Sequence, residues 1–326
     1  MGNLDVICLG ELLIDFVSMD RDVSLAGSSG FKKAPGGAPA NVAAGAARLG
    51  LKAGFIGKVG NDPFGDYLRS VLDEIDVDTE FLVADPDART TLSFVAQKSD
   101  GVRDCMFYRN PGADMLLRPE ELDTAYFEGA SFFHFGSISL GCEPVKSATL
   151  KAIDLAKGKG LLVSYDPNLR PTLWPDMDTA RREILAGFPH ADVVKISEEE
   201  YGDILGVDTP EACAEAILAM GPKLVVVTLG PRGCFFSDGS NTGYLPTFDD
   251  VTVVETTGAG DAFVAATLSG IISRLKDKDP DALRADDAFR RILIFANAAG
   301  SLATTKLGAI PSLPTTGDVL AFLAVR

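Results

Sequence analysis

Short apolar runs alternate with longer Ala-rich stretches along most of the chain. The apolar runs are rich in β-branched residues and predict strands at residues 4–9, 54–59, 131–135, 161–165, 192–196 and 223–228. The longer stretches predict helices at residues 40–49, 64–75, 144–157, 179–188, 210–220, 258–274 and 286–305. Strands that alternate with helices indicate an α/β fold, with a parallel sheet covered by helices on both faces.

Two stretches depart from this alternation. Residues 91–97 and 105–108 have strand composition and flank the sequence KSDGVRD, which is typical of a hairpin turn. Residues 17–33 show no helical pattern. We predict that these stretches form a small antiparallel flap over the sheet edge, either a lid that excludes water from a reaction or a surface hairpin. The chain has no internal repeat or long linker, so we expect one domain, residues 1–326, with lid segments at about 16–34 and 89–112.

The sequence ETTGAGD, residues 255–261, is the strongest indication of function. Gly258, Ala259 and Gly260 have no side chain or only a methyl group, so the backbone is accessible at the start of a predicted helix. Unpaired N–H groups and the positive end of the helix dipole then point at one spot, which favours phosphate. The negatively charged Asp261 cannot bind an anion. We expect it instead to take a proton from a hydroxyl group that attacks the phosphate. A Gly-rich turn that only begins a helix is the alternative for this motif on its own.

Two other nucleotide motifs are missing from the sequence. The glycines are not followed by the Lys and Ser or Thr of a P-loop, and no GxGxxG opens a helix after the first predicted strand. A P-loop nucleotide triphosphatase and a dinucleotide-dependent dehydrogenase are therefore both disfavoured.

The composition of the chain limits which partners we expect and indicates a cellular compartment. The chain has 30 basic and 46 acidic residues, and its net charge of −16 argues against nucleic acid or an anionic membrane as a partner. The five Cys residues form no CxxC pair, which predicts free thiols in a reducing compartment. We see no membrane-spanning run and no signal or transit peptide, so we expect a cytoplasmic protein. The chain has only two His residues, which leaves acid–base chemistry to Asp and Glu.

Polar residues and glycines near the N-terminus suit a polyol. We expect Asp15 at the end of the first strand, at the edge where open α/β sheets bind ligands, with a turn or helix cap as its alternative role. Gly36 and Gly37 let the backbone approach a ligand closely, and Asn41 offers an amide in the helix that follows.

Later strand ends carry further candidates. Asn168 and Arg170 follow the strand at 161–165, and Arg109 closes a flap strand, although an isolated Arg is ordinarily a solvated surface residue. The sequence KISEEE, residues 195–200, enters a helix, and the dipole alone favours acids there. The alternative is that Glu200 organises magnesium through water.

Taken together, these segments resemble the ribokinase-like (pfkB) family of carbohydrate kinases. GGxxxN near residue 40 and TTGAGD near residue 260 are similar to the two signatures of that family, and the likeness extends over essentially the whole chain. The segments PGGAPANVA, FIGKVGNDPFG, FYRNPGADMLL, HFGSISL, SYDPNLRPTLWP, KISEEE and GAIPSLPT are most similar to plant-type fructokinases.

The resemblance implies a fold, an activity and site residues. The fold is a three-layer α/β/α sandwich with a mostly parallel central sheet and a small β-sheet lid. The activity is phosphorylation of the 6-hydroxyl group of D-fructose with ATP and Mg²⁺, with Asp261 as general base and an anion hole at residues 258–260. The implied sugar positions are Asp15, Gly36, Gly37, Asn41, Arg109, Asn168 and Arg170, and the implied nucleotide positions are Lys195, Ser197, Thr228, Gly230, Gly233 and Asn297.

The resemblance also implies two cation positions. Glu200 matches the glutamate that organises magnesium through water. Glu255 matches a monovalent-cation site, with potassium as the ion, where many members have Asp. Ser197 stands where many relatives have Asn.

Other functions stay open. A kinase of the same fold that acts on ribose, adenosine or 2-keto-3-deoxygluconate differs only in its acceptor pocket. A catalytically weak regulatory subunit is the second alternative, although Gly258, Gly260 and Asp261 are intact. An exposed strand edge can pair with another chain, so we predict a homodimer formed through the lid.

Overall fold

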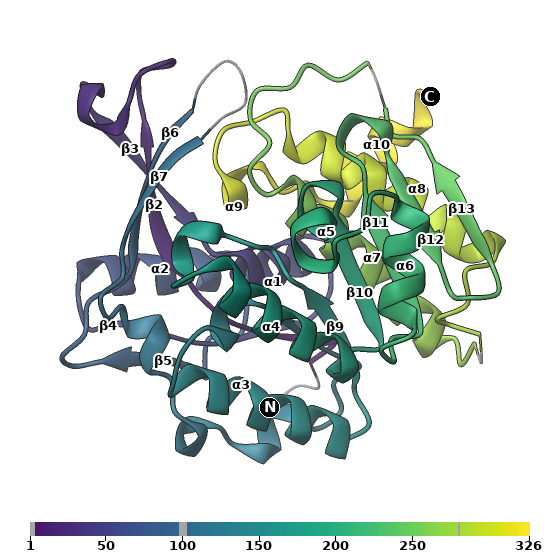
Figure 1. The fold of residues 1–326 in the computed structure, drawn as a ribbon, viewed down its shortest axis with the longest axis horizontal. Coiled ribbons are helices and arrows are strands. Elements are labelled where there is room, and N and C mark those ends of the chain that lie inside the picture. Colours follow the sequence, from purple (N-terminus) through teal and green to yellow (C-terminus); the bar gives the residue numbers. More distant parts are fainter. Residues whose placement is uncertain (1–3, 98–102, 249, 280) are drawn as a thin grey trace.

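The computed structural model describes residues 4–97, 103–248, 250–279 and 281–326, and its centre is a large sheet (Figure 1). The strand order is β13-β12-β11-β10-β9-β8-β1-β4-β5. Neighbouring strands run parallel, except that β12 is antiparallel to both β11 and β13. The strands are β1 (Val6–Leu9), β4 (Ala53–Gly60), β5 (Leu82–Asp85), β8 (Phe132–Gly136), β9 (Leu162–Asp166), β10 (Val193–Ser197), β11 (Leu224–Thr228), β12 (Cys234–Ser237) and β13 (Thr242–Leu245).

Both faces of this sheet are buried. Alternate residues of a strand point to opposite faces, so Val6 and Cys8 of β1 join one apolar cluster and Ile7 and Leu9 join the other. This double burial explains why the strands are continuous apolar runs in the sequence rather than alternating apolar and polar residues.

Helices cover each face and complete three layers. One cluster packs under α1 (Ala38–Arg48), α2 (Pro63–Asp73), α7 (Ala259–Lys276), α8 (Asp287–Ala303), α9 (Ala309–Ser312) and α10 (Thr316–Ala324). The other packs under α3 (Val145–Gly158), α4 (Met177–Gly187), α5 (Glu198–Leu205) and α6 (Pro210–Leu218). Short 3-10 helices connect these elements at Leu25–Gly27, Ala113–Leu116, Pro119–Glu121, Thr124–Phe127, Ile138–Leu140, Pro171–Leu173, Phe188–His190 and Gly230–Arg232.

The helices α1 and α7 pack closely through small residues. A Cβ atom added to Gly45 of α1 would lie only 2.8 Å from the Cβ atom of Ala265 of α7. Their neighbours Ala44 and Ala266 are fully buried. Small residues at this contact let the two helix backbones approach each other.

A second, four-stranded sheet stands apart from the first, at the upper left of Figure 1. Its order is β3 (Phe31–Gly36), β2 (Leu13–Ser18), β6 (Leu92–Gln97) and β7 (Arg103–Tyr108). We call this sheet the lid. The prediction of a wholly antiparallel flap is wrong in one respect, because β2 runs parallel to β6. The reason is that β6 enters from the main sheet after β5 and not from a hairpin with β2. Most of the predicted hairpin turn, residues 98–102, lies outside the described residues.

The expected place of Asp15 is also wrong. The first strand ends at Leu9, and Asp15 belongs to β2 in the lid. Apolar residues continue from Leu12 to Ile14, so the sequence does not reveal that the chain leaves one sheet and enters another.

Every predicted helix and the other predicted strands overlap an observed element. The sequence pattern did not predict the strands β5, β12 and β13 or the helices α9 and α10. No helix within the described ranges is both long and apolar enough to cross a membrane.

Candidate active site

The first turn of α7 forms an open backbone site. Gly258 precedes the helix in the left-handed conformation, with φ of 84°, and a Cβ atom there would lie 3.0 Å from the Cα atom of Ala309. The N–H group of Ala259 bonds to the carbonyl oxygen of Thr256 at 3.3 Å. Those of Gly260 and Asp261 have no acceptor among the described residues. Free N–H groups at a helix N-terminus attract an anion.

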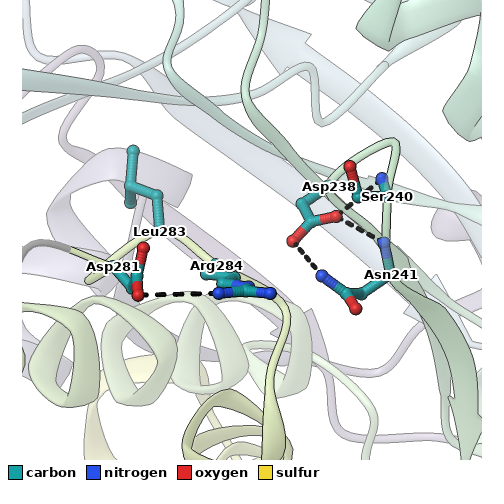
Figure 2. A pocket seen from close by; sticks show the side chains of 6 residues that line it. All are labelled: Asp238, Ser240, Asn241, Asp281, Leu283 and Arg284. Atoms are coloured by element: carbon teal, nitrogen blue, oxygen red, sulfur yellow. Dashed lines mark hydrogen bonds and ion pairs between the residues drawn. The ribbon is translucent and has the colours of Figure 1, made fainter.

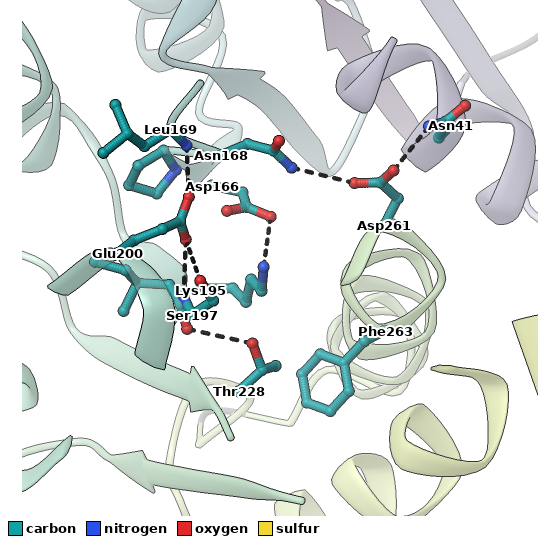
Figure 3. Close-up of polar contacts among 12 residues, drawn as sticks. Asn41, Asp166, Asn168, Leu169, Lys195, Ser197, Glu200, Thr228, Asp261 and Phe263 are labelled. Atoms are coloured by element: carbon teal, nitrogen blue, oxygen red, sulfur yellow. Dashed lines mark hydrogen bonds and ion pairs between the residues drawn. The ribbon is translucent and has the colours of Figure 1, made fainter. Parts of the chain in front are cut away.

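The carboxyl group of Asp261 is buried at this turn between two amide side chains (Figure 3). Asn41 of α1 donates from Nδ2 to Oδ2 at 2.8 Å, and Asn168, after β9, donates to Oδ1 at 3.5 Å. The Oδ1 atoms of both asparagines are buried and have no partner within the described chain. Each amide therefore presents an unused acceptor beside the carboxylate, which suits the hydroxyl groups of a ligand.

Burial raises the pKa of Asp261 to about 6, because a charged carboxylate is poorly solvated there. The hydrogen bond from Asn41 opposes this rise, the charge of Asp166 adds to it, and the positive charges of Lys195 and Arg170 oppose it. The carboxylate is then ionised at neutral pH and has an affinity for protons above that of an ordinary Asp. This property suits a general base.

A buried ion pair lies beside Asp261. The Nζ atom of Lys195, in β10, is 3.1 Å from Oδ2 of Asp166 at the end of β9. Burial alone would lower the pKa of Lys195, but the charges of Asp166 and Glu200 outweigh that effect and raise it. A Cβ atom on Gly260 would lie 3.2 Å from Nζ, so the ammonium group faces the first turn of α7. The second oxygen of Asp166, Oδ1, is buried without a partner among the described residues.

Glu200 joins two segments of the site. One carboxylate oxygen accepts a hydrogen bond of 2.5 Å from the N–H group of Leu169. The other accepts from Ser197, at 2.9 Å from its N–H group and 2.8 Å from its hydroxyl group. The three acids at the start of α5 are thus not equivalent, since Glu199 is exposed and Glu198 pairs with Arg232.

The loop before α1 is folded against the end of β1. Gly37 has φ of 115°, and a Cβ atom on it would lie 2.2 Å from the carbonyl oxygen of Glu11. The side chain of Glu11 accepts a hydrogen bond of 2.9 Å from the N–H group of Ala38, and burial raises its pKa to about 7. A Cβ atom on Gly36 would lie 2.2 Å from a carboxylate oxygen of Asp15, so this side chain lies over bare backbone. The first turn of α1 thus joins Glu11, through Ala38, to the surroundings of Asp261, through Asn41.

The two candidate arginines differ in their surroundings. The side chain of Arg109 is 8% exposed and pairs with Asp114 at 2.6 Å, so it is not a solvated surface residue. Arg170 is exposed and donates to the carbonyl oxygen of Leu169 at 3.0 Å.

Only some of the proposed nucleotide-binding residues lie close to one another. Thr228, at the end of β11, lies close to Ser197 in Figure 3 and donates to the carbonyl oxygen of Ile196 at 3.5 Å. Gly233 and Asn297 both lie against the end of β13 and the residue that follows it. A Cβ atom on Gly233 would lie 2.0 Å from the carbonyl oxygen of Leu245, and Asn297 donates to that of Pro246 at 3.1 Å. Gly230, with φ of 56°, belongs to the turn after β11.

Glu255 ties two loops together. Its carboxylate accepts hydrogen bonds from the hydroxyl group of Thr257 at 2.6 Å and from the N–H group of Gly308 at 2.7 Å. These loops flank Gly258 and Ala309, so the carboxylate supports the open turn at the start of α7.

A separate cavity near the β12–β13 turn contains none of the predicted site residues (Figure 2). Asp238 bonds to the backbone and side chain of Asn241, and Asp281 lies 3.6 Å from Arg284. The bonds of Asp238 stabilise the β12–β13 turn, and the contact of Asp281 with Arg284 lies within the segment between α7 and α8.

Three buried acids near the site were not predicted from the sequence: Glu11, Asp114 and Asp166. Glu11 and Asp166 stand at strand ends, where a functional role could have been suspected. Asp114 gives no such signal, since only the fold places it beside Arg109.

Known proteins are similar to this chain in sequence and in fold. The model of the pfkB family of carbohydrate kinases matches residues 3–316. The probable fructokinase-2 of Arabidopsis thaliana is 48% identical over 98% of this chain and 96% of that protein. A fructokinase from Xylella fastidiosa, solved with bound ATP, is 33% identical with a TM-score of 0.88 over 98% of both chains. A double-mutant fructokinase from Vibrio cholerae O395, bound to fructose, ADP and a potassium ion, is 34% identical with a TM-score of 0.85, again over 98% of both chains.

Proposed function

The chain belongs to the pfkB family of carbohydrate kinases, and from this premise we propose that it transfers the γ-phosphoryl group of ATP to the 6-hydroxyl group of D-fructose. The observation that carries the mechanism is the buried Asp261, held by Asn41 beside the free N–H groups of α7. Asp261 takes the proton of the attacking hydroxyl group as the phosphoryl group is transferred.

The chain positions the sugar through groups at the start of α1, after β9 and in the lid strand β2. The unpartnered Oδ1 atoms of Asn41 and Asn168 accept hydrogen bonds from sugar hydroxyl groups. Asp15 adds a carboxylate over the bare backbone of Gly36 and Gly37. Holding the reacting hydroxyl group at Asp261 converts a bimolecular reaction into one of fixed geometry, which can lower the barrier by several kcal/mol, of the order of 7–11 in favourable cases.

Charge on the transferring group is stabilised from two sides. The anion hole lies at residues 258–260, where the N–H group of Gly260 is free, and the free N–H group of Asp261 adds to it. Lys195 contributes its ammonium group from β10, where Asp166 holds it. Fixed donors of this kind need no reorganisation as charge develops. Thr228, Gly230, Gly233 and Asn297 are the residues that we propose bind the nucleotide.

The residues present fit magnesium held mainly by phosphate and water. Among the described residues no group of three His, Cys, Asp or Glu side chains could hold a metal. Mg²⁺ ordinarily uses one or two carboxylates together with substrate phosphates. The unpartnered Oδ1 atom of Asp166 and the carboxylate of Glu200 are the candidates to hold it, Glu200 through water. When bound, magnesium neutralises charge on the β- and γ-phosphates.

A panel of acceptors tests the proposed activity. ADP release is measured with magnesium and ATP on fructose, glucose, ribose, adenosine and 2-keto-3-deoxygluconate. We expect the highest kcat/KM for fructose. A higher kcat/KM for another acceptor would show that the phosphoryl-transfer residues are assigned correctly and the sugar is not. No turnover on any acceptor, with ATP still bound, would instead favour a regulatory subunit.

The rate of phosphorylation should depend on the ionisation of Asp261. Its pKa is about 6, and the base works only when it is ionised. We expect kcat/KM to be constant above pH of about 7 and to fall about tenfold per pH unit well below the pKa. A profile of kcat/KM from acid to neutral pH measures this limb.

Glu11 is the necessary control for that profile, because its pKa of about 7 falls in the same range. The Glu11→Gln variant should retain an acid limb at the same pH. If the limb disappears in Glu11→Gln, the titrating group is Glu11 and the assignment to Asp261 fails.

Potassium is a further candidate at the loops tied by Glu255. Both carboxylate oxygens already accept protein hydrogen bonds, so a cation there would use backbone carbonyl groups beside them. It would act on turnover by stabilising the loops that flank Gly258. Equal rates in potassium and sodium buffers would contradict this role.

We also propose a homodimer through the lid. The edge strand β7 exposes Met106 by 44% and Tyr108 by 59%, and an edge strand with exposed apolar residues favours association. Sedimentation of the wild-type protein and of Met106→Glu tests it. A wild-type monomer at micromolar concentration would exclude the dimer.

A further inference from the structure

Arg109 is held on one edge of its guanidinium group. It follows β7 directly, and although Tyr108 before it is largely exposed, the Arg109 side chain is buried. Its Nε and Nη2 atoms approach the same oxygen of Asp114, Oδ2, at 2.7 and 2.6 Å. A buried arginine with two donors on one carboxylate oxygen has a fixed orientation.

The other oxygen of Asp114 bonds to the opposite lid strand. Oδ1 accepts a hydrogen bond of 2.5 Å from the hydroxyl group of Thr91, the residue before β6. The next residues along the two strands, Leu92 and Tyr108, face each other in the lid. Asp114 thus joins both strands at the base of the lid, and its side chain is 2% exposed.

Gly112 leaves the space that this arrangement needs. A Cβ atom there would lie 1.9 Å from the Thr91 hydroxyl oxygen, 2.7 Å from Oδ1 of Asp114 and 3.0 Å from Cγ of Arg109. The backbone of Gly112 therefore fits among the three side chains only because it has no side chain of its own.

The remaining donors of Arg109 are available to a ligand. Its Nη1 atom has no acceptor among the described residues. Burial opposes the charged form of Arg109, but the charge of Asp114, and to a smaller extent that of Glu11, raises its pKa. Glu11 in turn accepts a hydrogen bond from the N–H group of Ala38 at the start of α1. Arg109 therefore lies within electrostatic range of Glu11, which supports the loop that carries the proposed sugar residues.

We propose that Asp114 is a positioning residue for sugar recognition: together with Thr91 it fixes Arg109 so that the free guanidinium donors face the acceptor sugar. This inference rests on the proposed function, in which Arg109 contacts the sugar. Asp114 itself touches neither sugar nor ATP.

The test compares Asp114→Asn and Arg109→Ala with the double variant. Asparagine has the shape of aspartate but lacks the charge, so Arg109 loses its fixed orientation. We expect the KM for fructose to rise about tenfold or more in each single variant, with the KM for ATP unchanged. Because Asp114 acts through Arg109, the double variant should be no worse than Arg109→Ala alone. Glu183→Gln, which breaks a surface ion pair with Lys146, is the control and should change neither KM.

Several outcomes would overturn the inference. An unchanged fructose KM in Asp114→Asn, a parallel rise in both KM values, or additive effects in the double variant would each show that Asp114 only supports the fold. If Asp114→Asn does not fold, Thr91→Val removes the bond to Oδ1 alone, and it should raise the fructose KM without affecting the ATP KM. If fructose is not the acceptor, the same ratios are measured on the best acceptor of the panel. A failure of the proposed sugar is then distinguishable from a failure of the positioning role.

Discussion

The Asp261→Asn variant is expected to lose turnover by several orders of magnitude while it keeps the fold and binds ATP. Asparagine can still accept the hydrogen bond from Asn41, but it cannot take the proton of the attacking hydroxyl group. General-base catalysis contributes about 10²–10⁴ in rate, and the lost charge also changes the alignment of the hydroxyl group. The measurements are kcat with saturating fructose and ATP, and ATP affinity by calorimetry. A variant that retains more than a tenth of the wild-type kcat would rule out Asp261 as the base.

The same substitution should make the protein more stable near neutral pH. The pKa of Asp261 is raised from 3.8 to about 6, so ionised Asp261 costs stability in the folded state. That cost is absent below the unfolded pKa, develops as pH rises through the folded pKa, and is complete above it. A shift of about two pKa units corresponds to about 3 kcal/mol. Urea unfolding should therefore show Asp261→Asn to be more stable than wild type at pH of about 7.5, with little difference at pH of about 3.5.

The Gly258→Ala variant should lower kcat by about 10²–10³, the effect of losing one oxyanion donor in other enzymes. The added Cβ atom would lie 3.0 Å from Cα and 3.2 Å from Cβ of Ala309, and φ of 84° is unfavourable for alanine. The first turn of α7 must then shift, and its N–H groups no longer point at the phosphoryl group. The measurement is kcat together with the KM for each substrate.

Gly206 provides a matched control for this variant. It also has a left-handed backbone, with φ of 70°, but a Cβ atom there would meet nothing within 4 Å. Gly206→Ala should therefore carry a similar backbone cost of about 1 kcal/mol and keep its activity. If both variants lose kcat equally, the loss reflects general destabilisation and not the turn before α7.

The main sheet could be predicted from the sequence because burial on both faces leaves a strong apolar pattern. The lid could not be predicted as well. The continuous apolar residues around Leu13 conceal a change of sheet, and that is why Asp15 was assigned to the first strand. The edge strand β13 alternates exposed and half-buried residues, so it lacks the continuous apolar signal of the central strands. Its neighbour β12 is buried but has only four residues, and it was not predicted either.

The site was predictable where a motif is local and not where it depends on packing. The turn at residues 258–261 can be interpreted from its own sequence. The hydrogen bond between Asn41 and Asp261 joins residues separated by 220 positions, and no local pattern predicts it. The burial that raises the pKa of Asp261 likewise comes from the whole fold. The roles of the individual site residues and the cytoplasmic location stay predictions.

The close packing of α1 against α7 has a consequence for enzyme engineering. Asn41 and Asp261 stand on different helices, and Gly45 and Ala265 set how far apart those helices lie. A single extra methyl group at Gly45 would force the helices apart and change the geometry of a hydrogen bond one turn away. The spacing of Asn41 and Asp261 is therefore set by residues without any functional group. A mutagenesis library restricted to pocket-lining positions would never sample the substitutions that adjust it.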